Sequence, residues 1–447
     1  MTMSNLDRRS FLRGAGASAL LTAATFEPAM AKAPSVLMRS AREDFDFDSP
    51  YDRVGTDCIK WDTPLATYDG IQVGMGIADM DFRAAPCITE ALAKRCAHEN
   101  WGYLRRPQRY SQAVVDWNMR RYGLEIDPES IVWTTGVHPG IIAALQTLAP
   151  PGTRVVMNTP TYNGFYTDVR FAHNVAEDNE MKVVDGRYQI DWDDFERRVR
   201  RSNVFILCNP QNPTGNCWSA DDMTRMGEIC LEHNTVVLSD EIHCDFVSAG
   251  EKYTPFASLP NREIVDNSIT FKAASKTFSL AAMKVAWYFS TNPTLLARVR
   301  ANTRADLTTL GMEANYAALT EGDEWFDQLS PYLDANHNFA EKEINSRLEG
   351  IRYTKAQGTY LAWLDVNGFA EAIDAADIAA RENETAVTQV TPETIVQRWF
   401  ANEAGVYLNP GHSYGTGGAG HMRMNLGTSR QMISTAIEKM AEAIARI

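Results

Sequence analysis

The sequence predicts an α/β fold, with a mostly parallel central sheet in a large domain and a smaller α+β domain after it. The chain has 447 residues, of which 45% are apolar and 22% charged, a globular balance with enough length for two joined domains. From residue 131 to about residue 290, short apolar runs alternate with amphipathic segments, which is typical of βα units. Near residue 325 this rhythm gives way to a long helical pattern.

The large domain is predicted to span residues 86–325. Residues 32–85 before it are predicted to form an N-terminal arm and part of the small domain. Apolar residues at helical spacing predict helices over 86–100 and 110–122. Apolar runs predict strands over 131–134, 154–158, 204–208, 236–239, 268–272 and 285–290. Helices are expected between most of them, one beginning near Gly140 and one over 219–233 with Ser219 as its N-cap.

The small domain is predicted to occupy residues 326–447. Helical patterns cover 325–348 and 430–446, and strand-like segments cover 359–366 and 421–425. The segment from about 369 to 393 is rich in Ala, Glu, Asp and Thr. Its composition predicts an exposed insertion that is at least partly helical.

The N-terminus carries the features of an export signal. Arg8-Arg9-Ser10-Phe11-Leu12-Arg13 precedes a small, apolar stretch and the cleavage-site pattern Ala29-Met30-Ala31. We expect residues 1–31 to be a twin-arginine (Tat) signal peptide, so that the mature protein is periplasmic or otherwise exported. The apolar stretch is too short for a stable membrane anchor, and no membrane association is expected after its removal. The alternative is a fortuitous arginine pair in a disordered tail.

Charge and cysteine content exclude some classes of function. The net charge of −14 argues against nucleic acid as the main partner, because nucleic-acid binding needs a basic surface. The seven cysteines are widely spaced and form no C-x-x-C pair, so no metal site is expected. Reduced and mostly buried thiols are the simpler interpretation.

Three polar residues follow predicted strands in an informative order. They are Asn212 in the turn Asn209-Pro210-Gln211-Asn212-Pro213-Thr214-Gly215, Asp240 at the end of an apolar run, and Lys276. In a parallel sheet such positions meet at the carboxyl edge, where ligands bind. An amine that binds an aldehyde, a carboxylate for a pyridine nitrogen and an amide for a phenolic oxygen are what pyridoxal 5′-phosphate needs. Each residue alone has a plain alternative, as a surface lysine, an N-cap or a turn residue.

The cofactor's phosphate and ring need further partners. Gly136, Val137 and His138 follow a predicted strand and precede a predicted helix, whose N-terminus would offer free amides to an anion. Ser275 and Lys284 can add a hydroxyl group and a positive charge. We expect the ring of Tyr162 to stack on the pyridine ring, with a core tyrosine as the alternative.

Arg423 is a candidate for binding the substrate. It lies on a predicted strand after a glycine-rich loop, from which a guanidinium can bind a carboxylate in bidentate geometry. The alternative is that Arg423 forms a salt bridge on the surface and binds no substrate. A carboxylate-binding site beside an aldehyde cofactor predicts an amino-acid substrate.

With these residues the chain resembles the fold-type I, pyridoxal-phosphate-dependent class I/II aminotransferase family, and within it the MalY/PatB branch of cystathionine or cysteine-S-conjugate β-lyases. The resemblance covers about residues 45–447. The motifs that carry it include Ala78-Asp79-Met80-Asp81-Phe82, Trp101-Gly102-Tyr103, Ser239-Asp240-Glu241-Ile242-His243 and the segment from Pro410 to Arg423.

The resemblance implies a role for each of these residues. Lys276 would form the Schiff base, Asp240 would pair with the pyridinium and Asn212 would bind O3′. Ala78 would lie at the substrate and His243 at the cofactor. Tyr103 would reach the phosphate of a neighbouring subunit, which implies a homodimer with shared active sites.

Two positions depart from the family pattern. Lys284 stands where many relatives carry the arginine that binds the phosphate. Gly76 stands where an aromatic residue is often found, which predicts a wider pocket.

The resemblance favours a reaction through an α-carbanion that ends in β-elimination of a sulfur group, giving a thiol, pyruvate and ammonia. Transamination to a 2-oxo acid and racemisation use the same lysine and stay open. A non-catalytic binding or regulatory protein is a further alternative, against which the complete set Lys276, Asp240, Asn212 and Arg423 argues.

Overall fold

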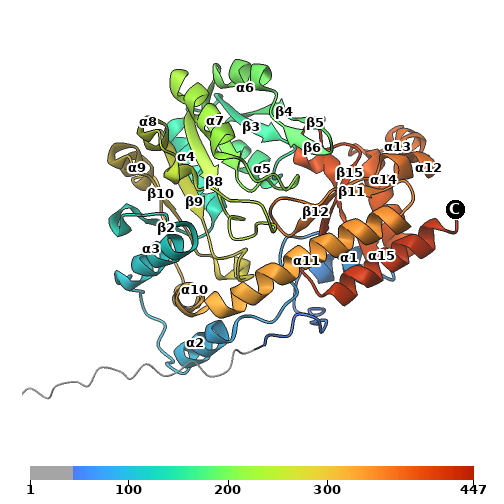
Figure 1. The fold of residues 1–447 in the computed structure, drawn as a ribbon, viewed down its shortest axis with the longest axis horizontal. Coiled ribbons are helices and arrows are strands. Elements are labelled where there is room, and N and C mark those ends of the chain that lie inside the picture. Colours follow the sequence, from blue (N-terminus) through green and yellow to red (C-terminus); the bar gives the residue numbers. More distant parts are fainter. Residues whose placement is uncertain (1–43) are drawn as a thin grey trace, which may run out of the picture. The chain divides into compact units, whose positions relative to one another are not determined.

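A seven-stranded sheet forms the centre of the larger part of the molecule. The structure is a computed structural model that describes residues 44–447 (Figure 1). The strands lie in the order β2-β10-β9-β8-β7-β3-β4. The pairs from β9 to β4 are all parallel, and β10 runs antiparallel to both of its neighbours. The strand bounds are β2 Val132–Thr134, β3 Arg154–Thr159, β4 Val175–Glu180, β7 Ser202–Cys208, β8 Val236–Asp240, β9 Ser268–Lys272 and β10 Ala286–Phe289.

Alternate residues of the central strands point into two separate cores. Val155 and Met157 of β3 pack on one face of the sheet, with helices α4, α5 and α9. Val156 packs on the other face, with α6, α7 and α8. A sheet covered on both faces needs apolar residues at every strand position, which explains the continuous apolar runs in the sequence. These helices are α4 Val137–Leu148, α5 Gly164–Phe171, α6 Trp192–Val199, α7 Ala220–Glu232, α8 Arg262–Asp266 and α9 Pro293–Arg300.

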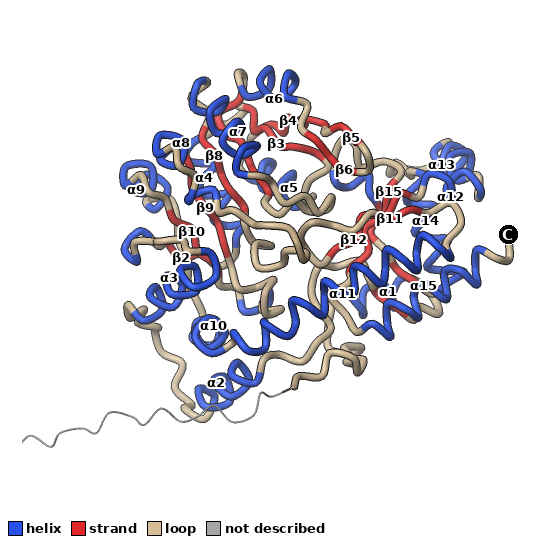
Figure 2. The backbone as a smooth tube through the Cα atoms, viewed as in Figure 1, coloured by secondary structure: helices blue, strands red, loops and turns tan. Residues whose placement is uncertain are grey.

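A four-stranded antiparallel sheet, β11-β12-β15-β14, lies apart from the first one (Figure 2). Its strands are β11 Arg352–Tyr353, β12 Leu361–Asp365, β14 Asn409–Pro410 and β15 His421–Asn425. The helices that pack with it are α11 Asp323–Arg347, α12 Asn367–Ala372, α13 Ala375–Asn383, α14 Pro392–Trp399 and α15 Arg430–Ile444. Residues 45–447 form one compact unit by their contacts, so the predicted division near residue 325 stays a prediction.

The long helix α11 takes part in two hydrophobic cores. Its first half packs Trp325 and Leu329 with α2 Pro86–Cys96, α3 Arg109–Tyr122 and α10 Thr309–Glu321. Its second half packs Ala340 and Ile344 against the small sheet. The remaining elements are helix α1 Ile59–Thr67, the parallel pair β1 Val73–Gly74 and β13 Val406–Tyr407, and the hairpin β5 Lys182–Val184 with β6 Arg187–Gln189.

The structure confirms the strands that were predicted from apolar runs and the N-cap at Ser219, whose hydroxyl accepts from the Asp222 amide. It corrects the start of α4, which begins at Val137 rather than near Gly140. Pro139 is accommodated in the first turn because a residue there needs no N–H for the helical hydrogen bonds.

Two further predictions differ from the structure. Strand β4 was not predicted, because the edge strand Val175–Glu180 is polar and half exposed. The segment 369–393 is largely helical as predicted but is not simply exposed, since Phe369, Ala375 and Ala379 are buried in the core of the small sheet.

The predicted signal peptide, residues 1–31, lies outside the described residues. Within residues 44–447, no helix is long and apolar enough to cross a bilayer.

A buried ion cluster holds the segment before α2 in place. The Lys60 ammonium lies 2.6 Å from Asp81 Oδ2, and both side chains are almost fully buried. Asp81 Oδ1 also accepts from Arg53 and from the Trp61 indole, each at 3.0 Å. The amide of Met80 donates to the Ser279 hydroxyl, which joins this segment to the loop that contains Lys276.

We predict that Asp81→Ala lowers the free energy of unfolding by about 3–5 kcal/mol, because it leaves the Lys60 ammonium buried without its carboxylate. Urea denaturation followed by tryptophan fluorescence measures this change. Lys60→Met is the matched comparison and should have a smaller effect, because Asp81 keeps Arg53 and Trp61. Equal stability of Asp81→Ala and the unmodified protein would contradict the assigned role.

Candidate active site

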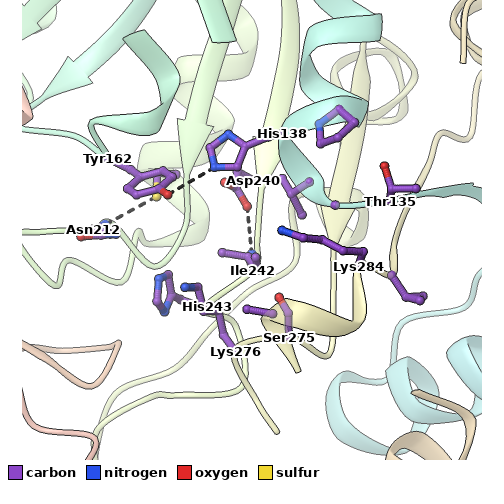
Figure 3. A pocket seen from close by; sticks show the side chains of 16 residues that line it. Thr135, His138, Tyr162, Asn212, Asp240, Ile242, His243, Ser275, Lys276 and Lys284 are labelled. Carbon is purple, nitrogen blue, oxygen red and sulfur yellow. Dashed lines mark hydrogen bonds between the residues drawn. The ribbon is translucent and has the colours of Figure 1, made fainter. Parts of the chain in front are cut away.

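A cavity of about 500 Å³ lies where strands β7 and β8 end and helix α4 begins (Figure 3). Ten of the thirteen residues predicted for the site line it. They are Gly136, Val137, His138, Tyr162, Asn212, Asp240, His243, Ser275, Lys276 and Lys284. Segments far apart in the chain therefore meet at the carboxyl edge of the sheet, as expected for a doubly wound sheet.

Asp240 is the last residue of β8 and is 96% buried, with 4% of its surface exposed. Its Oδ1 accepts a hydrogen bond from the Ile242 amide at 3.0 Å. Burial raises the pKa of this carboxyl to about 7, against the smaller opposing effects of the Ile242 hydrogen bond and of His138. A cationic nitrogen placed in the cavity would restore the ionised carboxylate.

Lys276 follows β9 and extends into the same cavity. Its Nζ donates to the carbonyl oxygen of Ala78 at 2.7 Å. Burial and the charge of Arg423 lower the pKa of the amine to about 8, while Asp79 and Asp240 act in the opposite direction. Near neutral pH this lysine therefore gives up its proton more readily than an ordinary lysine, which a nucleophilic amine or general base requires.

Arg423 on β15 reaches the cavity wall through Asn212. Its Nη1 donates to Asn212 Oδ1 at 3.2 Å and its Nη2 donates to the Gly76 carbonyl at 2.6 Å. Because the oxygen of the Asn212 amide accepts from Arg423, its NH₂ group is directed elsewhere and can serve as a donor. Arg423 Nε is buried and has no hydrogen-bond partner within residues 44–447.

The first turn of α4 supplies an anion site. Gly136 is its N-cap, and Gly136 and Val137 line the cavity. First-turn N–H groups have no partner inside the helix and attract anions. Ser275 and Lys284 line the same cavity and add a hydroxyl group and an ammonium group.

His243 is fully buried in the cavity wall, and burial lowers its pKa well below the usual value, helped by the charges of Lys276 and Arg423. The imidazole is therefore neutral at physiological pH. Its Nδ1 has no hydrogen-bond partner in the described part of the chain.

Three predicted site residues do not line the cavity. Ala78 contributes its carbonyl oxygen to Lys276 and to the Tyr360 hydroxyl. Arg423 contacts the lining residue Asn212. Tyr103 is fully exposed beside a separate groove, so within one chain it does not reach the site.

The structure also adds information that the sequence did not provide. Asp168 on α5 pairs with His138, at 2.7 Å between Oδ2 and Nδ1. No single-sequence signal joins these residues, which come together only on folding. The space that a side chain at Gly76 would occupy is filled by Asn409 and Tyr407, so this glycine does not widen the cavity as predicted.

The donor set fits pyridoxal phosphate. The cavity combines a buried carboxylate for a cationic ring nitrogen, an amine of lowered pKa, an amide donor and a helix N-terminus for a phosphate. Among residues 44–447 no group of His, Cys, Asp and Glu side chains could hold a metal ion.

Comparison with known proteins agrees with this fit. Residues 70–440 match the family model described as aminotransferase class I and II. The chain is 34% identical over 407 residues to cystathionine beta-lyase PatB of Bacillus subtilis (strain 168), covering 90% of this chain and 100% of that protein.

Two solved structures have the same fold. Cystalysin from Treponema denticola, which contains a pyridoxal 5′-phosphate cofactor, superposes with a TM-score of 0.82 at 26% identity, covering 90% of this chain and 100% of that one. The pyridoxal-phosphate-bound C–S lyase from Staphylococcus hominis superposes with a TM-score of 0.78 at 25% identity, covering 90% and 98%.

The chain therefore belongs to the class I and II aminotransferase family. Its fold is that of the pyridoxal-phosphate-dependent C–S lyases of fold type I. Both the predicted family and the predicted fold class are confirmed.

We predict that the Lys276 amine in cofactor-free protein titrates near pH 8. Asp240→Asn should lower this pKa, because it removes a negative charge that favours the ammonium form. Arg423→Met should raise it, because it removes a cation. The pH dependence of trinitrobenzenesulfonate labelling, with Lys276 located by peptide mapping, gives the three values. A midpoint near the ordinary lysine value of about 10.4 would contradict the burial of this amine.

Proposed function

We propose that the protein is a pyridoxal-phosphate-dependent C–S β-lyase. Its substrate would be cystathionine or another cysteine S-conjugate, and its products a thiol, pyruvate and ammonia. The observation that carries the proposal is the placement of the Lys276 amine and the Asp240 carboxylate in one buried cavity. The names of the relatives, a cystathionine beta-lyase and C–S lyases, support the choice of reaction within the family.

The roles of the residues follow from their environment. When bound, pyridoxal phosphate supplies an electron sink that stabilises negative charge on the substrate Cα. Asp240 holds a proton at the pyridine nitrogen, which keeps that sink cationic. Lys276, whose pKa is lowered to about 8, takes the proton from Cα as a general base, and the Ala78 carbonyl accepts a hydrogen bond from its amine.

Arg423 would bind the substrate carboxylate. Arg423 is buried, with 3% of its surface exposed, and the present partners of its guanidinium, Asn212 and the Gly76 carbonyl, carry no formal charge. A carboxylate would provide a charge-assisted, bidentate partner for this cation. Amino-acid substrates carry such a group next to the amine that reacts with the cofactor.

Incubation of the holoprotein with cystathionine tests the reaction. We expect pyruvate and ammonia in equal amounts without any added 2-oxo acid. Lys276→Ala should lower the rate by at least about 10²–10⁴-fold, the usual contribution of a positioned general base, and leave the circular dichroism spectrum unchanged. Asp240→Ala should also slow the reaction, because the ring nitrogen loses its partner. Unchanged turnover by Lys276→Ala would refute the assignment.

Transamination is the second candidate, because the family model takes its name from this reaction and because Lys276 serves both transamination and β-elimination. Amino-group transfer that depends on a 2-oxo acid, without pyruvate from cystathionine, would favour it. A protein that binds no cofactor and shows no visible absorbance band would instead be a non-catalytic member of the fold.

We further propose a homodimer in which Tyr103 of each subunit completes the site of the other. The Tyr103 side chain is fully exposed and that of Trp101 is half exposed, on a loop beside a groove lined by Arg109 and Glu313. Large exposed aromatic side chains of this kind often mark an interface.

Subunit mixing tests this arrangement. A mixture of Lys276→Ala and Tyr103→Ala chains should regain activity, because one site of each mixed dimer keeps both residues. Sedimentation analysis should give a mass of two chains. A monomeric holoenzyme with full activity would contradict the shared site.

Export through the twin-arginine route is a separate proposal, which rests on the sequence of residues 1–31. Replacement of both Arg8 and Arg9 by lysine should keep the uncleaved protein in the cytoplasm. Fractionation of cells that express either form measures this, and export of the double variant would contradict the route.

A further inference from the structure

Three hydrogen-bonded side chains, Asp168, His138 and Tyr162, lie in and behind the cavity wall. Asp168 on α5 is 98% buried, with 2% exposed, and its Oδ2 lies 2.7 Å from His138 Nδ1. The other ring nitrogen of His138, Nε2, lies 3.2 Å from the Tyr162 hydroxyl (Figure 3). His138 and Tyr162 both line the cavity, whereas Asp168 lies behind them. A carboxylate, an imidazole and a phenol are thus hydrogen-bonded in series and end at the cavity.

The backbone is shaped for this arrangement. A Cβ atom at Gly164 would lie 2.4 Å from His138 Cε1 and 2.5 Å from Tyr162 Cε1, so both rings lie directly against the glycine. Phe165 packs against the Tyr162 ring at 5.5 Å between centroids, edge to face. The relative position of the two rings therefore depends on the absence of a side chain at residue 164.

The series has a defined direction. The Asp168 carboxylate accepts the Nδ1 proton of His138, so Nε2 faces Tyr162. When the imidazole is neutral, Nε2 accepts the phenolic proton. When it is protonated, Nε2–H donates to the phenolic oxygen, and the O–H of Tyr162 is free to donate into the cavity. Burial raises the pKa of Tyr162 to about 12, so this group keeps its proton and acts as a donor.

We propose that His138, held by Asp168, supplies the proton that Tyr162 delivers to the departing sulfur atom of the substrate. The inference rests on the proposed β-elimination. The Cβ–S bond breaks and its electron pair stays on sulfur, which takes the proton of Tyr162. The phenolic oxygen takes the Nε2 proton of His138, and the neutral imidazole is reprotonated by water before the next turnover.

The alternative proton donor is Lys276, which has just taken the Cα proton. Lys276 and Tyr162 line the same cavity of about 500 Å³, so both can reach one amino-acid substrate. The two routes differ in one respect. A donor other than Lys276 matters only for a leaving group that needs a proton, whereas Lys276 is needed for every substrate.

The charged and titratable groups that act on His138 set its pH dependence. They are Asp168 and Tyr162 at its two nitrogens, and Asp240 and Lys276 from other walls of the cavity. Burial lowers the pKa of His138, but the hydrogen bond and charge of Asp168 outweigh burial and leave it above the usual value. The protonated form is present below this pKa, so thiol release should fall as pH rises through it.

The test compares two leaving groups on the holoenzyme. S-Ethyl-L-cysteine releases a basic thiolate that needs a proton, and β-chloro-L-alanine releases chloride, which needs none. We expect Asp168→Asn and His138→Phe to lower the ratio of kcat/KM for S-ethylcysteine to kcat/KM for chloroalanine by about 10²-fold, the scale of general acid catalysis. Exchange of the Cα proton of L-alanine in D₂O, followed by NMR, should fall in these variants no more than chloroalanine turnover does, and should be lost in Lys276→Ala.

Further variants distinguish proton transfer through His138 and Tyr162 from a purely structural role of these side chains. Tyr162→Phe and Gly164→Ala should show the same selective loss, the first by removing the donor and the second by displacing both rings. His138→Gln keeps an N–H group beside Tyr162 but has no side chain that titrates. This variant should therefore lose the decrease in the rate of thiol release that accompanies rising pH. His173→Asn is the matched control, which removes an exposed imidazole at a left-handed position that asparagine tolerates, and it should change nothing.

Three outcomes would overturn the proposal. Equal losses for both substrates in His138→Phe would indicate a structural role, and no loss for S-ethylcysteine would assign the proton to Lys276. A wild-type protein that exchanges the Cα proton but releases pyruvate from neither substrate would refute the proposed lyase function itself. The proposed proton transfer from His138 through Tyr162 would be refuted with it.

Discussion

The active site depends most on the burial of two groups of opposite charge, the Asp240 carboxylate and the Lys276 amine. Burial moves both pKa values toward neutrality, to about 7 for the acid and about 8 for the amine. Each group can therefore gain or lose a proton near physiological pH at a small free-energy cost. Adjacent parallel strands, β8 and β9, bring the two to the same edge of the sheet.

The backbone from Gly76 to Asp79 organises the remaining polar groups. Four successive carbonyls accept hydrogen bonds from side chains of distant segments. The donors are Arg423 to Gly76, Asn425 to Ile77, Lys276 and Tyr360 to Ala78, and Lys60 and Asn425 to Asp79. The catalytic lysine, the small sheet and the N-terminal ion cluster therefore share one short stretch of main chain. A displacement of this stretch would change the position of the amine and of the guanidinium together.

The sequence predicted what depends on local patterns. Strands buried on both faces appear as apolar runs, and polar residues directly after them, such as Asp240 and Lys276, mark the carboxyl edge of the sheet. The edge strand β4 was missed because it needs no apolar run. Helix α4 begins earlier than predicted, at Val137, because Pro139 is tolerated in a first turn.

Contacts between distant segments could not be predicted in the same way. The pairing of Asp168 with His138 and the bond from Arg423 to Asn212 join residues from different elements, and a single sequence records no relation between them. The prediction of a wider pocket at Gly76 failed for the same reason. Tyr407 and Asn409, which fill the space beside this glycine, come from the distant strands β13 and β14. The proposed role of Tyr103 depends on a second chain.

The ion cluster around Asp81 limits how far the N-terminus can be shortened. Arg53 and Lys60 both contact this carboxylate, and the adjoining Ala78 carbonyl accepts from the reactive lysine. A proteolytic cut after Arg53 would remove one of the two cations, and a cut after Lys60 would leave the acid buried with neither. The predicted maturation site after residue 31 lies upstream of both positions. Proteolysis beyond Arg53 would thus remove the cations that hold this carboxylate and would disturb the main chain that positions the reactive lysine.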